Sequence, residues 1–96
     1  MTVEIRPARP GDEHVVVALV AELAEYERLK RAAEATAELI SDALFCANPR
    51  VFCEIAEVDG EVAGFAMWFY SFSTFRGRHG IFLEDIFIRV TGRSLA

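Results

Sequence analysis

Two adjacent carboxylates, Glu84 and Asp85, lie in the middle of an apolar stretch that runs from residue 81 to residue 89. Gly80 and Gly92 bound this stretch, which is too short for a helix and therefore predicts a strand. Its apolar composition favours burial on both faces. Because neighbouring strand residues point to opposite faces, at least one carboxylate would then point into a pocket or a paired site, since an isolated buried charge is very costly. The alternative is an edge strand with one face in water.

The charge distribution favours a small cationic ligand over nucleic acid. The 96 residues carry 15 acidic and 10 basic side chains, which gives a net charge of −5. An acidic body repels a phosphate backbone and attracts cations over long distances. The C-terminal end is locally basic, because it contains Arg76, Arg78, Arg89 and Arg93.

The length of 96 residues indicates one small domain spanning residues 1–96, with a thin core. Cys46 and Cys53 match no spacing typical of a metal or redox site, and both are expected to be buried thiols in a reducing compartment. Charged residues interrupt the N-terminus, and the longest uncharged run, 62–75, is too short to cross a bilayer. We therefore expect a cytoplasmic protein with no metal site, no nucleic-acid partner and no membrane partner.

Hydrophobic patterning predicts an α+β order of strand, helix, helix and three strands. The predicted strands are 2–6, 51–58, 61–73 and 81–89, and the predicted helices are 13–29 and about 36–44. Asp12 and Thr36 can cap the two helices through their side-chain oxygens. Asp59-Gly60 is a strong signal for a two-residue hairpin turn. The last three strands follow one another as a meander, so a mainly antiparallel sheet is expected.

Four segments of the chain resemble the GNAT N-acetyltransferases. They are Ile5-Arg6-Pro7-Ala8, Glu22-Leu23-Ala24-Glu25-Tyr26-Glu27, Gly64-Phe65-Ala66-Met67 and Phe82-Leu83-Glu84-Asp85-Ile86-Phe87-Ile88. They occur in the order and spacing of that family, and the last segment looks most like the spermidine/spermine and thialysine N-acetyltransferase branch. The resemblance implies a truncated GNAT fold that lacks its C-terminal strand-helix half.

The resemblance also implies acetyl transfer from acetyl-CoA to a primary amine of a polyamine or a lysine-like small molecule. An alkyl ammonium must lose a proton before it attacks, and a nearby carboxylate can accept that proton. The family places its proton relay at the position of Glu84, which is the expected catalytic base. Family positions that hold the amine or line the substrate groove match Asp85, Glu27 and Phe75. A solvated helix-end charge is the alternative for Glu27, and core packing is the alternative for Phe75.

The resemblance further implies that the pantetheine arm of acetyl-CoA lies along the strand end that contains Phe87, Ile88 and Arg89. A backbone amide near Phe87 or Ile88 would polarise the thioester carbonyl. Family members continue with a glycine-rich loop and a helix whose N-terminal amides hold the pyrophosphate. Here only Thr91-Gly92-Arg93-Ser94-Leu95 resembles that loop, and the tyrosine that protonates the leaving thiolate has no counterpart. Weakened cofactor binding is therefore expected.

Three functions remain open from the sequence. The chain is an acetyltransferase or the N-terminal part of one, or it is a catalytically inactive relative that acts as an oligomerising or interaction module. The third alternative, a small ligand-binding domain unrelated to acetyl transfer, leaves the Leu83-Glu84-Asp85 match unexplained. Without the later strands, one sheet edge and one apolar face stay uncovered, and such surfaces recruit other chains. We therefore expect a homo-oligomer such as a dimer.

Overall fold

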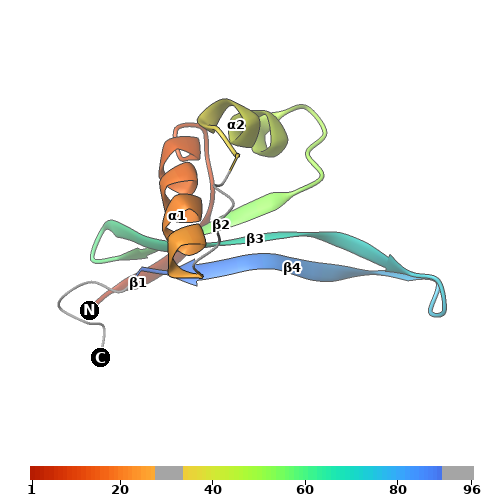
Figure 1. Cartoon of the computed structure of the whole chain (residues 1–96). Helices are drawn as coiled ribbons and strands as arrows, with labels where there is room; N and C mark the ends of the chain where they lie inside the picture. Colours follow the sequence, from red (N-terminus) through yellow and green to blue (C-terminus); the bar gives the residue numbers. More distant parts are fainter. Residues whose placement is uncertain (28–33, 90–96) are drawn as a thin grey trace.

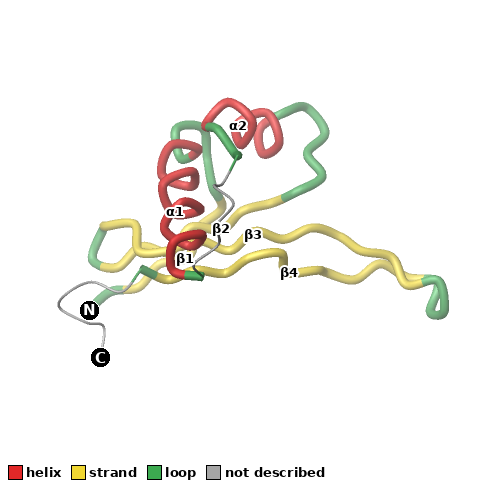
Figure 2. Tube along the Cα trace, in the orientation of Figure 1, coloured by secondary structure: helices red, strands yellow, loops and turns green. Residues whose placement is uncertain are grey.

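The computed structural model describes residues 1–27 and 34–89. Its elements in chain order are β1 (Val3–Pro7), α1 (Glu13–Tyr26), α2 (Ala37–Phe45), β2 (Phe52–Val58), β3 (Glu61–Ser73) and β4 (Arg78–Ile88) (Figure 1). The strands form one antiparallel sheet in the order β1-β2-β3-β4. Both helices lie on the same face of this sheet (Figures 1 and 2). The predicted α+β order and the antiparallel sheet are confirmed. The predicted extension of the first helix to residue 29 lies partly outside the described residues.

A small hydrophobic core lies between the helices and the sheet. The buried side chains of this core are Val16, Leu19, Leu44, Cys53, Ile55, Phe65 and Met67. They recur at helical spacing on α1 and at every second residue on β2 and β3, so one face of each element enters the core. Burying one such large apolar side chain contributes about 1.5–3 kcal/mol. None of the seven comes from β4, whose Phe87 only borders the cluster.

β4 is an edge strand, which corrects the expectation of a strand buried on both faces. Among the described residues it pairs only with β3. Its exposed large side chains, each 45–65% accessible, are Ile81, Phe82, Leu83, Ile86 and Ile88. The two helices cover one face of the sheet, so the apolar side chains of the other face meet solvent. The apolar composition of β4 could not predict this exposure, because composition does not show whether helices pack on one face of a sheet or on both.

β3 and β4 extend as a two-stranded arm beyond the region that the helices cover (Figure 1). At the base of the arm the register shifts, because Met67 opposes Asp85 whereas Trp68 opposes Leu83. Glu84 is therefore the extra residue of a β-bulge. At the far end, the turn that joins the two strands uses Gly77 at a positive φ of 67°. The acidic doublet therefore lies at the bulge, at the base of the arm.

The two predicted helix caps had different outcomes. Thr36 caps α2, and its hydroxyl accepts a hydrogen bond from the amide of Leu39 at 3.1 Å. Asp12 occupies the position before α1 but makes no side-chain cap bond. Its carboxylate instead accepts a 2.7 Å hydrogen bond from the guanidinium of Arg6. A charge-assisted bond to arginine is stronger than a bond to a neutral amide. The carboxylate of Asp12 therefore pairs with Arg6 instead of capping the helix.

Backbone angles and burial test two other expectations. The Asp59-Gly60 hairpin turn is confirmed, with φ values of 52° and 84°. Cys53 is buried but Cys46 is exposed, which corrects the expectation of two buried thiols. In the described part of the chain, no helix is long and apolar enough to cross a bilayer. The same residues form no cluster of three or more side chains that could hold a metal ion.

Candidate functional site

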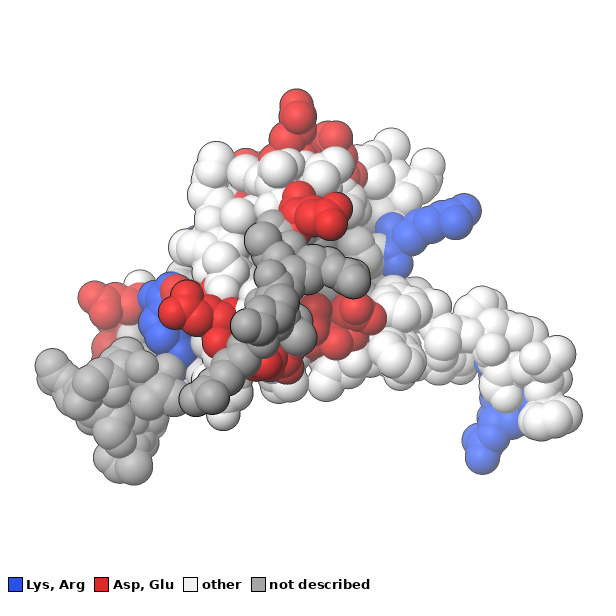
Figure 3. Space-filling view, viewed as in Figure 1, with Lys and Arg blue, Asp and Glu red and all other residues white. Residues whose placement is uncertain are grey.

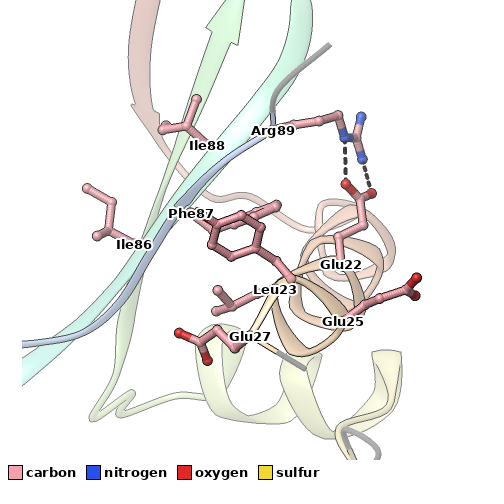
Figure 4. A pocket seen from close by; sticks show the side chains of 9 residues that line it. Glu22, Leu23, Glu25, Glu27, Ile86, Phe87, Ile88 and Arg89 are labelled. Atoms are coloured by element: carbon pink, nitrogen blue, oxygen red, sulfur yellow. Dashed lines mark hydrogen bonds and ion pairs between the residues drawn. The ribbon is translucent and has the colours of Figure 1, made fainter. Parts of the chain in front are cut away.

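A groove of about 660 Å³ lies between the C-terminal end of α1 and the end of β4. Two segments that are distant in sequence, 22–27 and 86–89, form its walls (Figure 4). The lining side chains are Glu22, Leu23, Glu25, Tyr26, Glu27, Ile86, Phe87, Ile88 and Arg89. The rings of Tyr26 and Phe87 approach each other with centres 6.4 Å apart. The lining therefore combines aliphatic and aromatic surface with three glutamates and one arginine.

An ion pair joins the two walls of the groove. The guanidinium of Arg89 donates two hydrogen bonds to the carboxylate of Glu22, at 3.0 Å from Nε and 2.6 Å from Nη2 (Figure 4). This pairing raises the pKa of Arg89. Two donors on one carboxylate fix orientation as well as distance. Within the described residues, Glu25 and Glu27 have no cationic partner, so the lining as a whole carries negative charge.

The acidic doublet lies next to the groove rather than in its lining. Asp85 opposes the buried Met67 of β3, on the helix-covered face, and is itself half-buried. Desolvation and the negative charges of Glu84 and Glu27 raise the pKa of Asp85. Glu84, on the bulge, is exposed. The doublet therefore consists of one sheltered carboxylate that favours a neighbouring cation and one carboxylate in contact with water.

The backbone edge of β4 borders the same groove. The amide of Arg89 donates to the carbonyl of Ala63 at 2.6 Å, so it points toward β3. Backbone amides alternate in direction along a strand. The amide of Ile88 therefore points to the outer side, where no described residue pairs with β4. This end of the strand offers a free hydrogen-bond donor beside the groove.

Most of the residues singled out in the sequence gather at this end of β4. Phe87, Ile88 and Arg89 line the groove, and Glu27 lies in the opposite wall. Phe75 is not brought there: it lies in the turn at the far end of the arm, and its side chain is fully exposed. Neither the groove nor the core contains it, so the alternative of core packing for Phe75 is wrong.

Sequence reasoning missed Glu22, Glu25 and Tyr26 as groove residues. A signal was present, because three glutamates occupy six consecutive positions at the C-terminal end of the first helix. Negative charge is unfavourable at that end of a helix dipole. An acidic cluster in such a place suggests a cation from outside the helix, which Arg89 supplies to Glu22 in this fold.

Comparison with known proteins finds similarity to N-acetyltransferases. No protein-family model matches the chain. Over 95 residues it is 36% identical to the thialysine N-epsilon-acetyltransferase of Bos taurus, an alignment that covers 91% of this chain and 55% of that protein. Over 93 residues it is 34% identical to the spermidine/spermine N(1)-acetyltransferase-like protein 1 of Homo sapiens, which covers 88% of this chain and 13% of that protein.

The solved structures agree. The ribosomal-protein-alanine N-acetyltransferase from Brucella melitensis biovar Abortus 2308 superposes with a TM-score of 0.75 at 18% identity, over 93% of this chain and 59% of that chain. The chain has the N-terminal half of the GNAT acetyltransferase fold. This GNAT half-fold spans about half the length of the thialysine acetyltransferases that it matches. The segment that resembles the family's pyrophosphate loop, 91–95, lies outside the described residues.

Proposed function

We propose that this chain provides the amine-binding part of an acetyl-CoA-dependent N-acetyltransferase that acts on a primary amine of a polyamine or a lysine-like small molecule. The observation that carries the proposal is that several carboxylates line or border one groove, beside a strand edge that is free among the described residues. Glu25 and Glu27, at the C-terminal end of α1, are among the lining residues, and Asp85 lies next to the groove on β4. Carboxylates attract an alkyl ammonium, while Tyr26 and Phe87 offer apolar surface to its methylene groups.

Asp85 and Glu27 are the proposed ligands of the ammonium group. Desolvation, together with the negative charges of Glu84 and Glu27, raises the pKa of Asp85, and a cation between Asp85 and Glu27 would relieve the repulsion between them. Glu84 is the proposed base, which takes the amine proton directly or through one water. Its exposed position on the bulge gives the proton a route to solvent.

Acetyl-CoA is the proposed acyl donor, placed along the edge of β4 at 87–89, where it would supply an activated acetyl thioester. The residues present fit it in part. The outward amide of Ile88 can donate to a carbonyl there. Arg89, the one cation among the described residues of the groove lining, is held by Glu22. We therefore expect this chain to bind the cofactor weakly.

Incubation of the chain with acetyl-CoA and a series of polyamines and lysine analogues, with release of free thiol as the readout, tests the proposal. Asp85→Asn should raise the KM for the amine. Glu84→Gln should lower kcat most strongly at lower pH, where a larger fraction of the amine is protonated. Glu38→Gln, an exposed change on α2, is the control. No acetylation of any amine, together with no rise in Tm on adding acetyl-CoA, would remove the proposal.

A second candidate function is a non-catalytic self-association module, which the edge of β4, unpaired among the described residues, favours. Under either function we propose a homo-oligomer, because the edge and the uncovered apolar face both attract further chains. Retained self-association in a chain that neither binds acetyl-CoA nor acetylates amines would favour the module. A cytoplasmic location stays a prediction.

A further inference from the structure

We propose that the ion pair between Glu22 and Arg89 couples the binding of the amine to the binding of the cofactor. A second cationic group of the amine takes the place of Arg89 at the carboxylate of Glu22, and the released guanidinium then binds a phosphate of the cofactor. Each ligand thereby favours the other. The inference rests on the proposed function, and it explains how a groove whose described lining contains one cation, already paired, receives an anion.

The two partners of the ion pair belong to different walls of the groove. Glu22 lies on α1, in the same lining as Glu25 and Glu27, which are proposed to attract the amine. Arg89 directly follows β4, next to the backbone at 87–88 along which the cofactor is proposed to lie. In Figure 4 the side chain of Arg89 extends from the strand to Glu22 on the helix. The ion pair therefore joins the amine side of the groove to its cofactor side.

A single ammonium group does not reach all of these carboxylates. The proposed function places one ammonium group between Asp85 and Glu27. Glu22 precedes Glu27 by five residues, which is about 7.5 Å along the axis of a helix, and the two carboxylates point to different sides of the helix end (Figure 4). An amine with two or more cationic groups can therefore occupy both positions, whereas a simple alkylamine cannot.

The surrounding charge makes the amine the ligand that breaks the ion pair. The described lining contains three glutamates and one arginine, so pairing leaves two negative charges uncompensated. On the face that Figure 3 shows, acidic side chains also gather over the helices and the middle of the sheet. This negative surface attracts a polycation and repels the phosphates of a cofactor. Once the amine compensates the carboxylates, Arg89 can exchange Glu22 for an anion.

The ion pair is suited to such an exchange because water reaches it. The side chains of Arg89 and Glu22 are 37% and 40% exposed, and exposed ion pairs contribute little to stability. Arginine keeps its charge at physiological pH, so the pair breaks by exchange of partners and not by deprotonation of the guanidinium. Each ligand strengthens the binding of the other by the same factor, which the strength of the ion pair limits. For an exposed pair this factor is roughly two to five.

Isothermal titration calorimetry of CoA binding, with and without saturating spermidine, measures this factor. CoA replaces acetyl-CoA so that no acetyl group is transferred. Spermidine should lower the Kd of CoA roughly twofold to fivefold, whereas butylamine, which has a single ammonium group, should not. Without amine, Glu22→Gln should bind CoA more tightly than the unmodified chain. The same variant should lose the effect of spermidine, because its Arg89 is already released.

Glu25→Gln is the matched control, because it removes the same charge from the same lining and breaks no ion pair among the described residues. It should weaken the binding of spermidine but keep the effect of spermidine on CoA. Pairing of spermidine with CoA in solution acts equally on all three proteins, so the difference between the two variants measures the contribution of the ion pair. An effect of spermidine that persists in Glu22→Gln overturns the proposal.

The Nε–H signal of Arg89 in a heteronuclear NMR spectrum follows the ion pair in the absence of cofactor. Arg89→Lys assigns this signal by its loss, and spermidine should shift it toward its position in Glu22→Gln. An unchanged Arg89 signal, while the backbone amides of Tyr26 and Phe87 shift, overturns the proposal and leaves the amine site of the proposed function intact. Independent binding of CoA and spermidine has the same consequence. If the chain binds neither ligand, this proposal and the proposed function fall together.

Discussion

Arg89 and Glu22, 67 residues apart in the chain, hold the end of β4 against α1 through two side-chain hydrogen bonds of 3.0 and 2.6 Å. Among the described residues this is the one side-chain hydrogen-bonded link between that strand and that helix. It fixes the walls of the groove relative to each other. It also neutralises Arg89, the one cation among the described lining residues and the one best placed of these to meet an anionic cofactor.

We expect Glu22→Gln to strengthen the binding of acetyl-CoA and to change the free energy of unfolding only slightly. Both side chains are more than a third exposed, so the loss in the free energy of unfolding should be about 0–1 kcal/mol. The released guanidinium should bind acetyl-CoA more tightly, as measured by isothermal titration calorimetry. Glu25→Gln, at the same helix end but without an arginine partner among the described residues, is the matched control. Weaker cofactor binding in Glu22→Gln than in the control would contradict this role for Arg89.

Asp85→Asn should stabilise the fold at neutral pH. Desolvation, Glu84 and Glu27 raise the pKa of Asp85 above its ordinary value, so the native state binds a proton more readily than the unfolded chain does. The contribution of this group to the free energy of unfolding therefore increases as pH falls through the raised pKa toward about 3.9. Urea denaturation of both proteins from neutral to acidic pH measures this difference, which should shrink as pH falls. If Asp85→Asn were less stable than the unmodified chain at neutral pH, desolvation and repulsion by Glu84 and Glu27 would not destabilise the charged form of Asp85.

The opposite pH dependence is expected at Asp12. Its carboxylate accepts hydrogen bonds from the guanidinium of Arg6 at 2.7 Å and from the amide of Arg9 at 2.8 Å. The bond from Arg6, followed by that from Arg9, lowers the pKa of Asp12. The resulting stability is present above the unfolded pKa of about 3.9 and is lost as pH falls through the lowered native pKa.

Asp12→Asn should therefore cost about 1.5–3 kcal/mol at neutral pH, because it removes charge-assisted hydrogen bonds in a mostly buried pair. The cost should fade as the solution is acidified, and thermal denaturation across the pH range follows it. Asp42→Asn, an exposed change on α2, should cost little at any pH. A cost at Asp12 that does not vary with pH would show that packing, rather than charge, accounts for it.

Gly64→Ala should disturb the strand edge that borders the groove. A Cβ at Gly64 would collide with the carbonyl oxygen of Phe87 and would lie 2.6 Å from Cδ1 of Ile88. The backbone of β4 must then move, which should cost roughly 1–3 kcal/mol and displace the edge at 87–89. Gly80→Ala is the matched change in the same strand pair, since its Cβ would meet only Oγ of Ser71 at 3.5 Å. Equal melting temperatures for the two variants would show that the close approach at Gly64 is not a real constraint.

Local signals in the sequence determined the elements of this protein. Helical spacing of apolar side chains predicted the helices, alternation predicted the first strand, and apolar runs bounded by turn residues predicted the later strands. Asp59-Gly60 and Thr36 marked a turn and a cap. These signals succeed because they depend only on residues close in the chain. The doublet Glu84-Asp85 was visible for the same reason, since two carboxylates in an apolar run are costly without a partner.

Tertiary structure alone decided how those elements meet. That β4 lies at the edge of the described sheet, that Glu84 lies on a bulge, and that Arg89 contacts Glu22 all depend on segments many residues apart. A bulge is a property of two paired strands, so alternation along one strand predicted opposite faces for the doublet but not the exposure of each carboxylate. Likewise, the exposure of an apolar strand depends on the layers packed against it. Composition shows how much apolar surface could be buried, whereas only the assembled sheet shows which of that surface is buried.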